Sequence, residues 1–295
     1  MKVHRRCTAV AGIIMFSLFS FINSGCAEEP AMDSKSEAIL VAAFGTTVTE
    51  AREAYDRFEQ AARDRFKEKE VRWAFTSTQV RKKLADQGIV RESVGEALAG
   101  LAKDGYRKIA VLPLQVIPGV ETDLILKDVA SFLGTNKIDG ISVVAGKPLL
   151  AGYDDAQRAA KALLASAPQE RGKTDALVFM GHGSPHHAAD LFYVALASII
   201  RELDGRAFLG TVEGHPTLDD VVEQCLAMNC TKAWLIPFMA VAGDHVINDM
   251  AGDEDDSWKS VLKKEGIESK PVLQGMLDNA GVREIWLDHI ADALN

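Results

Sequence analysis

The sequence feature that most limits the possible folds is an internal repeat. Residues 108–113 (KIAVLP) recur as residues 232–237 (KAWLIP), and residues 147–152 (KPLLAG) recur as residues 270–275 (KPVLQG). The run 39–46 also resembles 177–184, since each is an apolar segment followed by a small-residue turn and a hydroxyl. Self-similarity of this kind indicates duplication of one structural unit. The chain is therefore expected to contain two similar halves.

Each half alternates short apolar runs with helical patterns. Runs typical of strands buried on both faces occur at residues 38–44, 71–75, 108–116, 141–145, 176–180, 207–212, 233–238 and 270–273. Apolar residues at helical spacing follow them at 50–67, 79–86, 91–103, 121–132, 155–167, 218–228, 258–264 and 282–294, and one further helix ends at 203. This alternation predicts an α/β protein with parallel sheets. We expect domains at 36–152 and 173–276, with a closing helix at 279–295.

The length and net charge of the chain limit its domain number and the kinds of partner it can bind. A length of 295 residues suits two domains that each bury a core. The net charge of −9 argues against a nucleic-acid partner, because phosphate binding needs a basic face. Small anionic ligands remain compatible with this charge, since they need only a local basic patch.

The first 27 residues have the layout of a secretory signal peptide. A basic start is followed by the apolar stretch 8–22 and by small residues at 24–27. The apolar stretch is short for a bilayer, so no stable membrane span is expected. Cleavage after Ala27 would give a periplasmic protein. Lipidation of Cys26 is an alternative, although Asn23 stands where such signals carry an aliphatic residue.

Two cysteines lie in the second half. Cys225 and Cys230 are close in sequence, near an expected helix end, which is an awkward arrangement for a disulfide. We interpret them as buried apolar residues. A disulfide between them is the alternative in an oxidising compartment.

Three strand-like segments of the second half end beside a potential metal ligand. His182 follows the first between two glycines, Glu213 follows the second and His245 follows the third. Parallel strands lie about 4.8 Å apart and deliver their C-terminal ends to one edge of the sheet. Two imidazoles and a carboxylate suit a divalent transition metal with open positions. Each residue alone could be structural, but three at equivalent strand ends predict a site.

Other polar residues are weaker candidates. Glu121 occupies, in the repeat, the position of His245, so it is a candidate for the opposite wall of a cleft. His215 precedes a proline and is expected to have at most a supporting role. The acidic run 249–256 is interpreted as a solvated loop before a helix capped near Ser257. The remaining histidines are expected to be structural or solvent-exposed: His186, His187 and His289.

Cofactor motifs are weak or absent in the sequence. Residues 140–147 imitate a phosphate loop, but the glycine spacing is wrong and Pro148 stands where a hydroxyl should bind magnesium. We therefore expect no nucleotide cofactor. The sequence contains no c-type haem attachment motif, so haem binding stays open without a motif to support it.

Four segments carry a family resemblance: ILVAAFGTT, MGHGSPHHAA, GTVEGHPTLDDVV and LIPFMAVAGDHVINDMAGDEDDSW. They resemble the anaerobic cobalt chelatase (CbiK-type) family of cobalamin biosynthesis, and the resemblance extends over nearly all of the mature chain. It implies two flavodoxin-like halves whose parallel sheets face a central cleft for a tetrapyrrole. It also implies a metal chelatase, a lyase that inserts divalent cobalt into sirohydrochlorin without ATP, with iron accepted by some members.

The resemblance also implies roles for individual residues. The metal-site histidines of the family fall on His182 and His245, and its site glutamate falls on Glu213. We hypothesise that the imidazoles hold the metal and assist loss of the pyrrolic protons, with Glu213 completing the site. Thr46 and Ser184 are expected to bind substrate carboxylates in the cleft, near Glu121.

The export signal leaves an alternative open. Chelatases of a cytosolic pathway need no such signal, so the competing hypothesis is a periplasmic tetrapyrrole- or metal-binding carrier without turnover. A zinc hydrolase would use the same ligands but would need a small polar pocket. We also expect a homo-oligomer.

Overall fold

The computed structural model describes residues 35–295, and Ser34–Asn295 form one compact unit. The expected signal peptide, with Ala27 and Cys26, lies outside the described residues. Within the described range, no helix is both long enough and apolar enough to cross a membrane.

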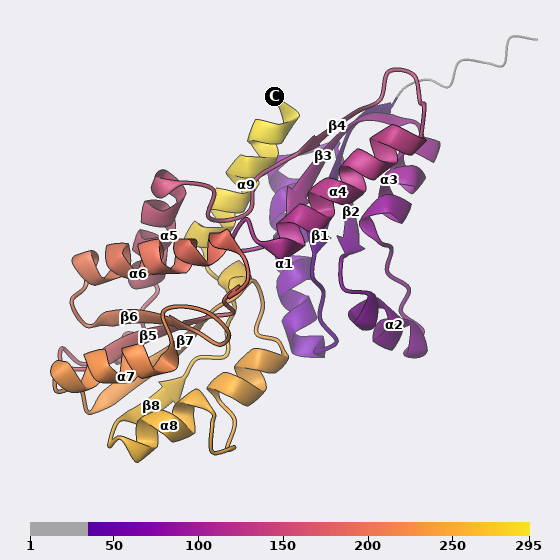
Figure 1. Ribbon diagram of the computed structural model, residues 1–295. Coiled ribbons are helices and arrows are strands. Elements are labelled where there is room, and N and C mark those ends of the chain that lie inside the picture. The colour runs from indigo at the N-terminus through magenta and orange to yellow at the C-terminus, as the bar shows by residue number, and fades with distance from the viewer. Residues whose placement is uncertain (1–34) are drawn as a thin grey trace, which may run out of the picture. The chain divides into compact units, whose positions relative to one another are not determined.

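The first half alternates strands and helices (Figure 1). Its strands are β1 (Lys35–Ala43), β2 (Glu70–Phe75), β3 (Tyr106–Pro113) and β4 (Ser142–Ala145). Its helices are α1 (Thr49–Arg65), α2 (Thr78–Asp86), α3 (Val94–Lys103) and α4 (Val120–Thr135), and α5 (Tyr153–Ala165) leads to the second half.

The second half repeats this plan. Its strands are β5 (Ala176–Gly181), β6 (Ala207–Thr211), β7 (Lys232–Phe238) and β8 (Glu268–Pro271). Its helices are α6 (Leu191–Leu203), α7 (Leu218–Ala227), α8 (Trp258–Lys264) and α9 (Ala280–Leu294). Three short helical segments are η1 (Ala188–Asp190), the π-helix η2 (Val246–Met250) and η3 (Met276–Asp278).

Both sheets of the described chain are parallel and share one topology. The strand orders are β2-β1-β3-β4 and β6-β5-β7-β8, which are equivalent by the internal repeat. The prediction of an α/β fold with two similar halves is therefore confirmed. In each sheet the two central strands, β1 and β3 or β5 and β7, are followed by strands on opposite sides of the pair. The boundary between the two central strands is the topological switch point, where ligands of open α/β folds bind. The residue limits 36–152 and 173–276 for the domains stay a prediction.

The central strands are apolar over most of their length because helices cover both faces of each sheet. Along β1, Ile39 and Val41 face one core, whereas Leu40 faces another. Along β5, Phe179 faces the first core and Val178 faces a third. The alternation follows from the two-residue period of a strand. It explains why the sequence shows unbroken apolar runs at these positions.

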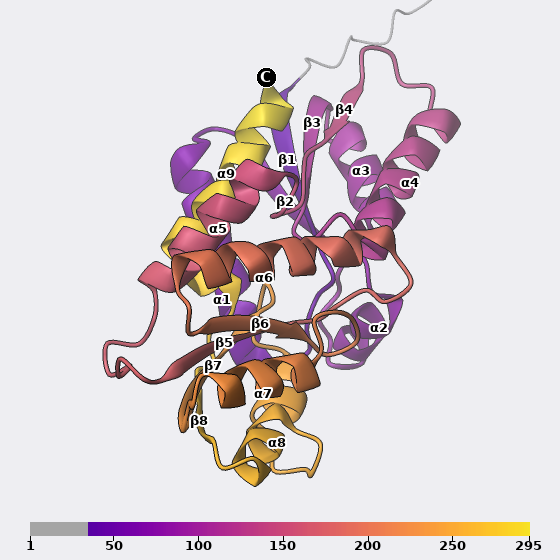
Figure 2. The ribbon, with the colours of Figure 1, turned by 60° about the vertical axis from the view of Figure 1, so that its left-hand side comes forward.

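One hydrophobic core is shared by the two halves. Residues of α1, α5, α6 and α9 join the inner faces of both sheets in a single cluster. The outer face of the first sheet is covered by α3 and α4, and that of the second by α7 and α8. Figure 2 shows α9 beside α5, with α6 below them. The halves are therefore held together by a continuous apolar interior.

Helix α9 closes the chain by packing on the first half. The Trp286 indole Nε1 donates to the Gln115 carbonyl oxygen at 3.3 Å, and its ring lies 6.5 Å from that of Phe58. Arg65 of α1 pairs with Glu284 at 2.9 Å. The sequence predicts this helix but not its partner, because nothing in its apolar spacing shows which sheet it covers.

Some element limits differ from the expected ones. The strand expected at 270–273 is instead β8, which ends at Pro271, a residue that cannot donate to a sheet ladder and is tolerated at an edge. The strand expected to reach residue 116 ends at Pro113. The Gln115 carbonyl oxygen then accepts from the Leu149 amide at 2.9 Å, so the backbone leaves the sheet to meet the loop after β4.

The two described cysteines are buried and unbridged. Cys225 lies on α7, and burial, reinforced by the neighbouring Cys230 thiol, raises the pKa of its thiol to about 12. The interpretation of both as buried apolar residues is confirmed.

We expect Trp286→Ala to lower the free energy of unfolding by about 3–5 kcal/mol, because it removes a fully buried side chain from the shared core. Urea denaturation measures this change. Asp292→Ala on the same helix is the control, since its side chain is 62% exposed, and it should change stability by less than about 0.5 kcal/mol. Equal stability of the two variants would contradict the role given to α9.

Candidate functional site

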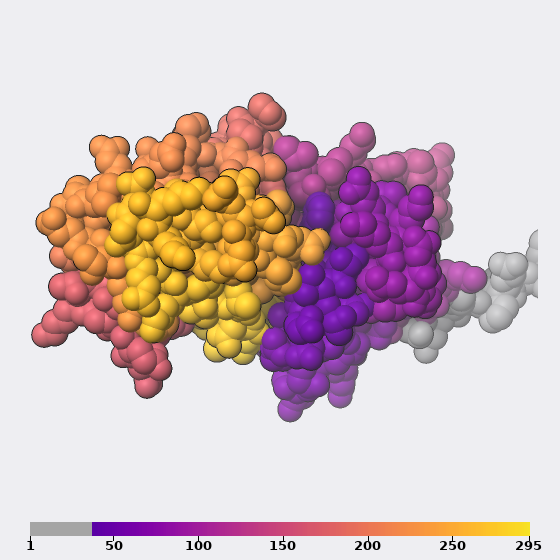
Figure 3. All heavy atoms as spheres, turned by 90° about the horizontal axis from the view of Figure 1, so that it is seen from below, coloured from indigo at the N-terminus to yellow at the C-terminus, as the bar shows by residue number. Residues whose placement is uncertain are grey.

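A cavity of about 570 Å³ lies between the two halves. The loops that follow β1, β3, β5, β6 and β7 line it, so both sheets present their C-terminal strand ends to the same space. Figure 3 shows a recess at the boundary between the indigo residues of the first half and the orange residues of the second. We refer to this cavity as the cleft.

His182 enters the cleft on a turn with two tightly packed glycines. A Cβ at Gly181 would lie 2.6 Å from the Tyr193 ring, and a Cβ at Gly183 would lie 2.5 Å from the Gly214 amide nitrogen. Gly183 also has φ of +90°, in the left-handed region that favours glycine. The glycines therefore let the loop after β5 pass close to the loop after β6 while the imidazole projects outward.

His182 and His245 lie side by side. β5 and β7 are neighbours at the switch point of the second sheet, and each histidine follows one of them. Their ring centroids are 4.8 Å apart with an interplanar angle of 87°. Both residues are half-buried and line the cleft.

Hydrogen bonds fix the orientation of both imidazoles. Nδ1 of His182 lies 3.0 Å from the Gly183 carbonyl oxygen, and Nδ1 of His245 lies 2.6 Å from Oδ2 of Asp249. Carbonyl and carboxylate oxygens accept, so each Nδ1 carries the proton and donates. In the neutral form of each ring, the lone pair then lies on Nε2, the atom that ligates a metal or accepts a proton.

Asp249 lies in the π-helix η2, which begins directly after His245, and its carboxylate meets the imidazole four residues back. From the sequence, Asp249 is expected only as part of a solvated acidic run, so this role is missed. The four-residue spacing from His245 is the signal that could have revealed it. Ser257, by contrast, caps α8 as expected.

Glu213 follows β6, so it enters the cleft on the side of His182 that lies away from His245. Its backbone amide donates to the His182 carbonyl oxygen at 2.9 Å, which ties the two loops together. Its side chain is exposed and lines the cleft. In residues 35–295, however, no three His, Cys, Asp or Glu side chains are gathered closely enough to hold a metal ion. The structure thus pairs the two imidazoles, and Glu213 as a third ligand stays a prediction.

Asp190 clamps the loops that carry His182 and Glu213. One of its carboxylate oxygens accepts from the Ser184 amide at 2.8 Å, and the other accepts from the His215 amide at 2.9 Å. Gly214 packs directly on this carboxylate, with no room for a Cβ. His215 therefore contributes its backbone, in agreement with the supporting role expected for it. The sequence analysis gives Asp190 no role.

The other candidates line the cleft from both halves. Thr46 is 6% exposed and its Oγ1 accepts from the Val48 amide at 3.1 Å. Ser184 lies on the loop after β5. Glu121 begins α4 on the opposite wall and accepts from the Thr76 hydroxyl at 3.0 Å. The structure places all three at the cleft, and their substrate contacts stay predictions.

The remaining histidines have separate roles. His289 is buried, with Nδ1 3.2 Å from the Lys147 carbonyl oxygen, so its structural interpretation is confirmed. His187 accepts from the Ala189 amide through Nδ1, and its Nε2 lies 3.2 Å from Asp123 of the first half. His187 thus bridges the halves, whereas the sequence suggests only a solvated helix start. His186 lines the cleft.

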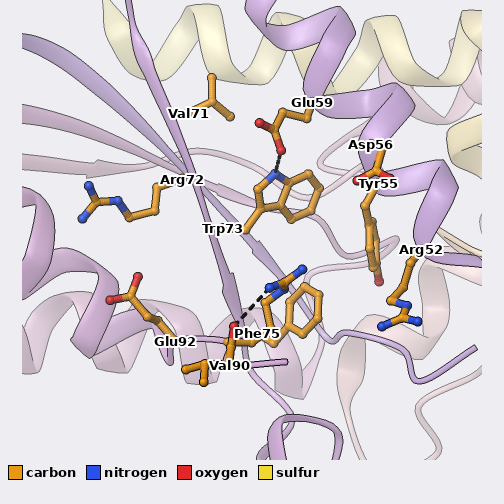
Figure 4. Close-up of a pocket in the computed structure, with 11 residues that line it drawn as sticks. Arg52, Tyr55, Asp56, Glu59, Val71, Arg72, Trp73, Phe75, Val90 and Glu92 are labelled. Carbon is orange, nitrogen blue, oxygen red and sulfur yellow. Dashed lines mark hydrogen bonds between the residues drawn. The ribbon is translucent and has the colours of Figure 1, made fainter. Parts of the chain in front are cut away.

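A second cavity of about 310 Å³ lies between α1 and the loop before α3, beside the edge strand β2. Figure 4 shows its aromatic lining, where Glu59 accepts from the Trp73 indole at 2.8 Å. Arginines and carboxylates alternate around it, so its charges balance. Tyr55 lines both cavities and separates them.

Sequence comparison identifies relatives along most of the chain. Residues 37–295 match the family described as cobalt chelatase (CbiK). The sirohydrochlorin cobaltochelatase CbiKC of Nitratidesulfovibrio vulgaris is 38% identical over 260 residues, which cover 88% of this chain and 91% of that protein. The sirohydrochlorin cobaltochelatase of Salmonella typhimurium is 34% identical over 272 residues, covering 88% and 97%.

Solved structures support the fold. SirB from Bacillus subtilis, determined with Fe³⁺, aligns with a TM-score of 0.62 at 14% identity and covers 88% of this chain and 96% of that one. DR2241 from Deinococcus radiodurans, described as similar to chelatases, aligns with a TM-score of 0.61 at 16% identity, covering 88% and 56%. At these identities the similarity shows the fold alone.

We expect Asp190→Ala to lower the free energy of unfolding by roughly 1–3 kcal/mol, because it leaves two loop amides without their acceptor. Hydrogen exchange should quicken at Ser184 and His215. Asp128→Ala, an exposed change on α4, is the control and should alter neither quantity. Unchanged exchange at both loop amides would show that the clamp is dispensable.

Proposed function

The chain belongs to the cobalt chelatase family, and from this membership and its cleft we propose that it inserts divalent cobalt into sirohydrochlorin. The observation that carries the proposal is the His182–His245 pair, whose Nε2 lone pairs are both left free by the contacts at Nδ1. Two relatives named sirohydrochlorin cobaltochelatases match 88% of the chain. Turnover is therefore favoured over a carrier that only binds.

The proposed reaction begins with cobalt at the two imidazoles. Nitrogen ligands suit cobalt and other divalent transition metals, and a site with two protein ligands leaves positions for water and for the incoming ring nitrogens. Asp249 holds the His245 ring in place and keeps its proton on Nδ1. Fixed ligands lower the entropic cost of placing the metal against the macrocycle.

Metal insertion requires that the ring lose both pyrrolic protons. As cobalt moves from the imidazoles to the ring nitrogens, the freed Nε2 atoms can accept these protons. Glu213 is exposed at the same cleft, so its carboxylate can take a proton and release it to solvent. One divalent cation enters the ring and two protons leave, so charge balances without ATP or a redox step.

The metal specificity in the cell belongs to the same proposal. Imidazole ligands bind iron as well as cobalt. The similarity to SirB with Fe³⁺ concerns the fold alone. We propose cobalt as the principal metal and iron as a second substrate, which insertion assays with each metal would rank.

We further propose that the protein acts after export. If residues 1–27 are an export signal, N-terminal sequencing of the protein from a bacterial periplasm should begin at Glu28. A retained Met1 would contradict export, and a lipid-modified Cys26 would establish the anchored alternative. Assembly into a homo-oligomer also stays a prediction.

We expect His245→Ala to slow cobalt insertion roughly 10²–10⁴-fold, because one metal ligand and proton acceptor is lost. Cobalt affinity, measured by calorimetry without tetrapyrrole, should fall about 10–100-fold. Asp128→Ala, an exposed change on α4, is the control and should retain the wild-type rate. Insertion by His245→Ala at that rate would refute the assignment.

Glu213→Gln separates the two roles of this carboxylate. If Glu213 accepts a proton, the insertion rate should fall about 10²-fold or more while cobalt affinity changes little. If it is a metal ligand, the affinity should fall with the rate. An unchanged rate and affinity would remove Glu213 from the site.

A further inference from the structure

The charged side chains of the cleft wall have the same sign as the carboxylates of its proposed substrate. Among the described residues, the lining of the cleft contains three carboxylates, Glu121, Glu213 and Asp244, and no lysine or arginine. Sirohydrochlorin carries acetate and propionate groups around its ring. A site built to pair those groups would present guanidinium or ammonium groups to them.

The cleft instead offers apolar surface. Phe44 and Val120 line it, and each is 49% exposed. Met239 lines the wall on the side of the second half. Phe44 is the repeat counterpart of His182, so an aromatic ring faces the cleft where the other half presents its imidazole. Such surface suits the flat face of a macrocycle.

The nearest arginines of the second cavity do not supply the missing charge. Arg52 and Arg91 line that cavity and not the cleft. The Arg52 guanidinium donates to the Thr49 hydroxyl at 3.0 Å, and the Arg91 guanidinium lies 5.9 Å from the Phe75 ring centroid. Tyr55 belongs to the lining of both cavities, and Figure 4 shows its ring in the wall of the second one.

We propose that the cleft recognises the face of the tetrapyrrole ring and leaves the ring's carboxylates in solvent, in place of the carboxylate contacts that the sequence predicts for Thr46 and Ser184. This inference rests on the proposed function. Its consequence is a broader ligand class, because carboxylates on the ring then add repulsion from the wall carboxylates and form no ion pair with a lysine or arginine of the cleft lining. Tetrapyrroles with fewer carboxylates are ligands of the same cleft and bind at least as tightly as carboxylate-rich ones.

The sign of the salt dependence tests the inference. Metal-free uroporphyrin and coproporphyrin, which has half as many carboxylates, are titrated with the protein and followed by their fluorescence. The titrations are made at about 20 mM and about 500 mM NaCl, which shortens the Debye length from roughly 20 Å to roughly 4 Å. Coproporphyrin should bind at least as tightly as uroporphyrin at low salt. High salt should leave the ratio of their Kd values unchanged or bring it closer to one.

Tighter binding of uroporphyrin at low salt, lost at high salt, would overturn the inference, because that pattern is produced by ion pairs. Failure of both porphyrins to bind would also overturn it. Using the ratio of two ligands removes the general effect of salt on apolar association.

A pair of lysine variants calibrates the measurement. Val120→Lys adds a cation to the cleft wall and should tighten uroporphyrin binding about twofold to fivefold at low salt. Leu133→Lys adds the same charge to an exposed position of α4 outside the cleft and should have no such effect. Absence of any effect of Val120→Lys would mean that the ring's carboxylates do not feel charges on the cleft wall, which contradicts the repulsion that the inference requires.

Cobalt insertion into sirohydrochlorin, measured separately on the same wild-type protein, distinguishes the two proposals. Insertion together with ion-pair-dependent porphyrin binding would refute only the inference about the cleft. Porphyrin binding with the expected Kd ratio and salt dependence, but without cobalt insertion, would refute only the proposed function.

Discussion

The apolar packing of α1, α5, α6 and α9 between the sheets is the constraint on which the rest of the structure depends. Each sheet needs this layer to cover its inner face, and the layer belongs to both. The cleft lies where the two sets of strand ends meet, so its width follows from how these helices pack. A shared core keeps Phe44 and His182 on opposing walls without a direct bond between them.

The chemistry of the cleft depends on a few hydrogen bonds that leave the right atoms free. A carbonyl oxygen and a carboxylate hold the two Nδ1 atoms, and the Asp190 clamp holds the loops. None of these partners faces a substrate in the proposed reaction. They fix in advance the ring orientations that metal binding needs, and such preorganisation is more effective in a partly buried cleft than in water.

Much of the fold could be predicted because its signals are local or repeated. The repeat predicts two equivalent halves, and apolar runs ending at glycine place His182 and His245 at strand ends. Two contacts could not be predicted: the partner of α9 and the clamp by Asp190. Both join segments distant in sequence. The pairing of Asp249 with His245 has the ordinary four-residue helical spacing, but Asp249 stands in an acidic run that is equally typical of a solvated loop.

The position of α9 has a consequence for how the chain is made. Residues 280–294 complete the inner layer against β3 and α5, yet the ribosome synthesises them after both sheets. The first half therefore leaves the ribosome without one of its covering helices and exposes part of its apolar interior until α9 has been made. Domains of many proteins fold one after another during translation. Here the two halves must reach their final packing together, in a late and cooperative step.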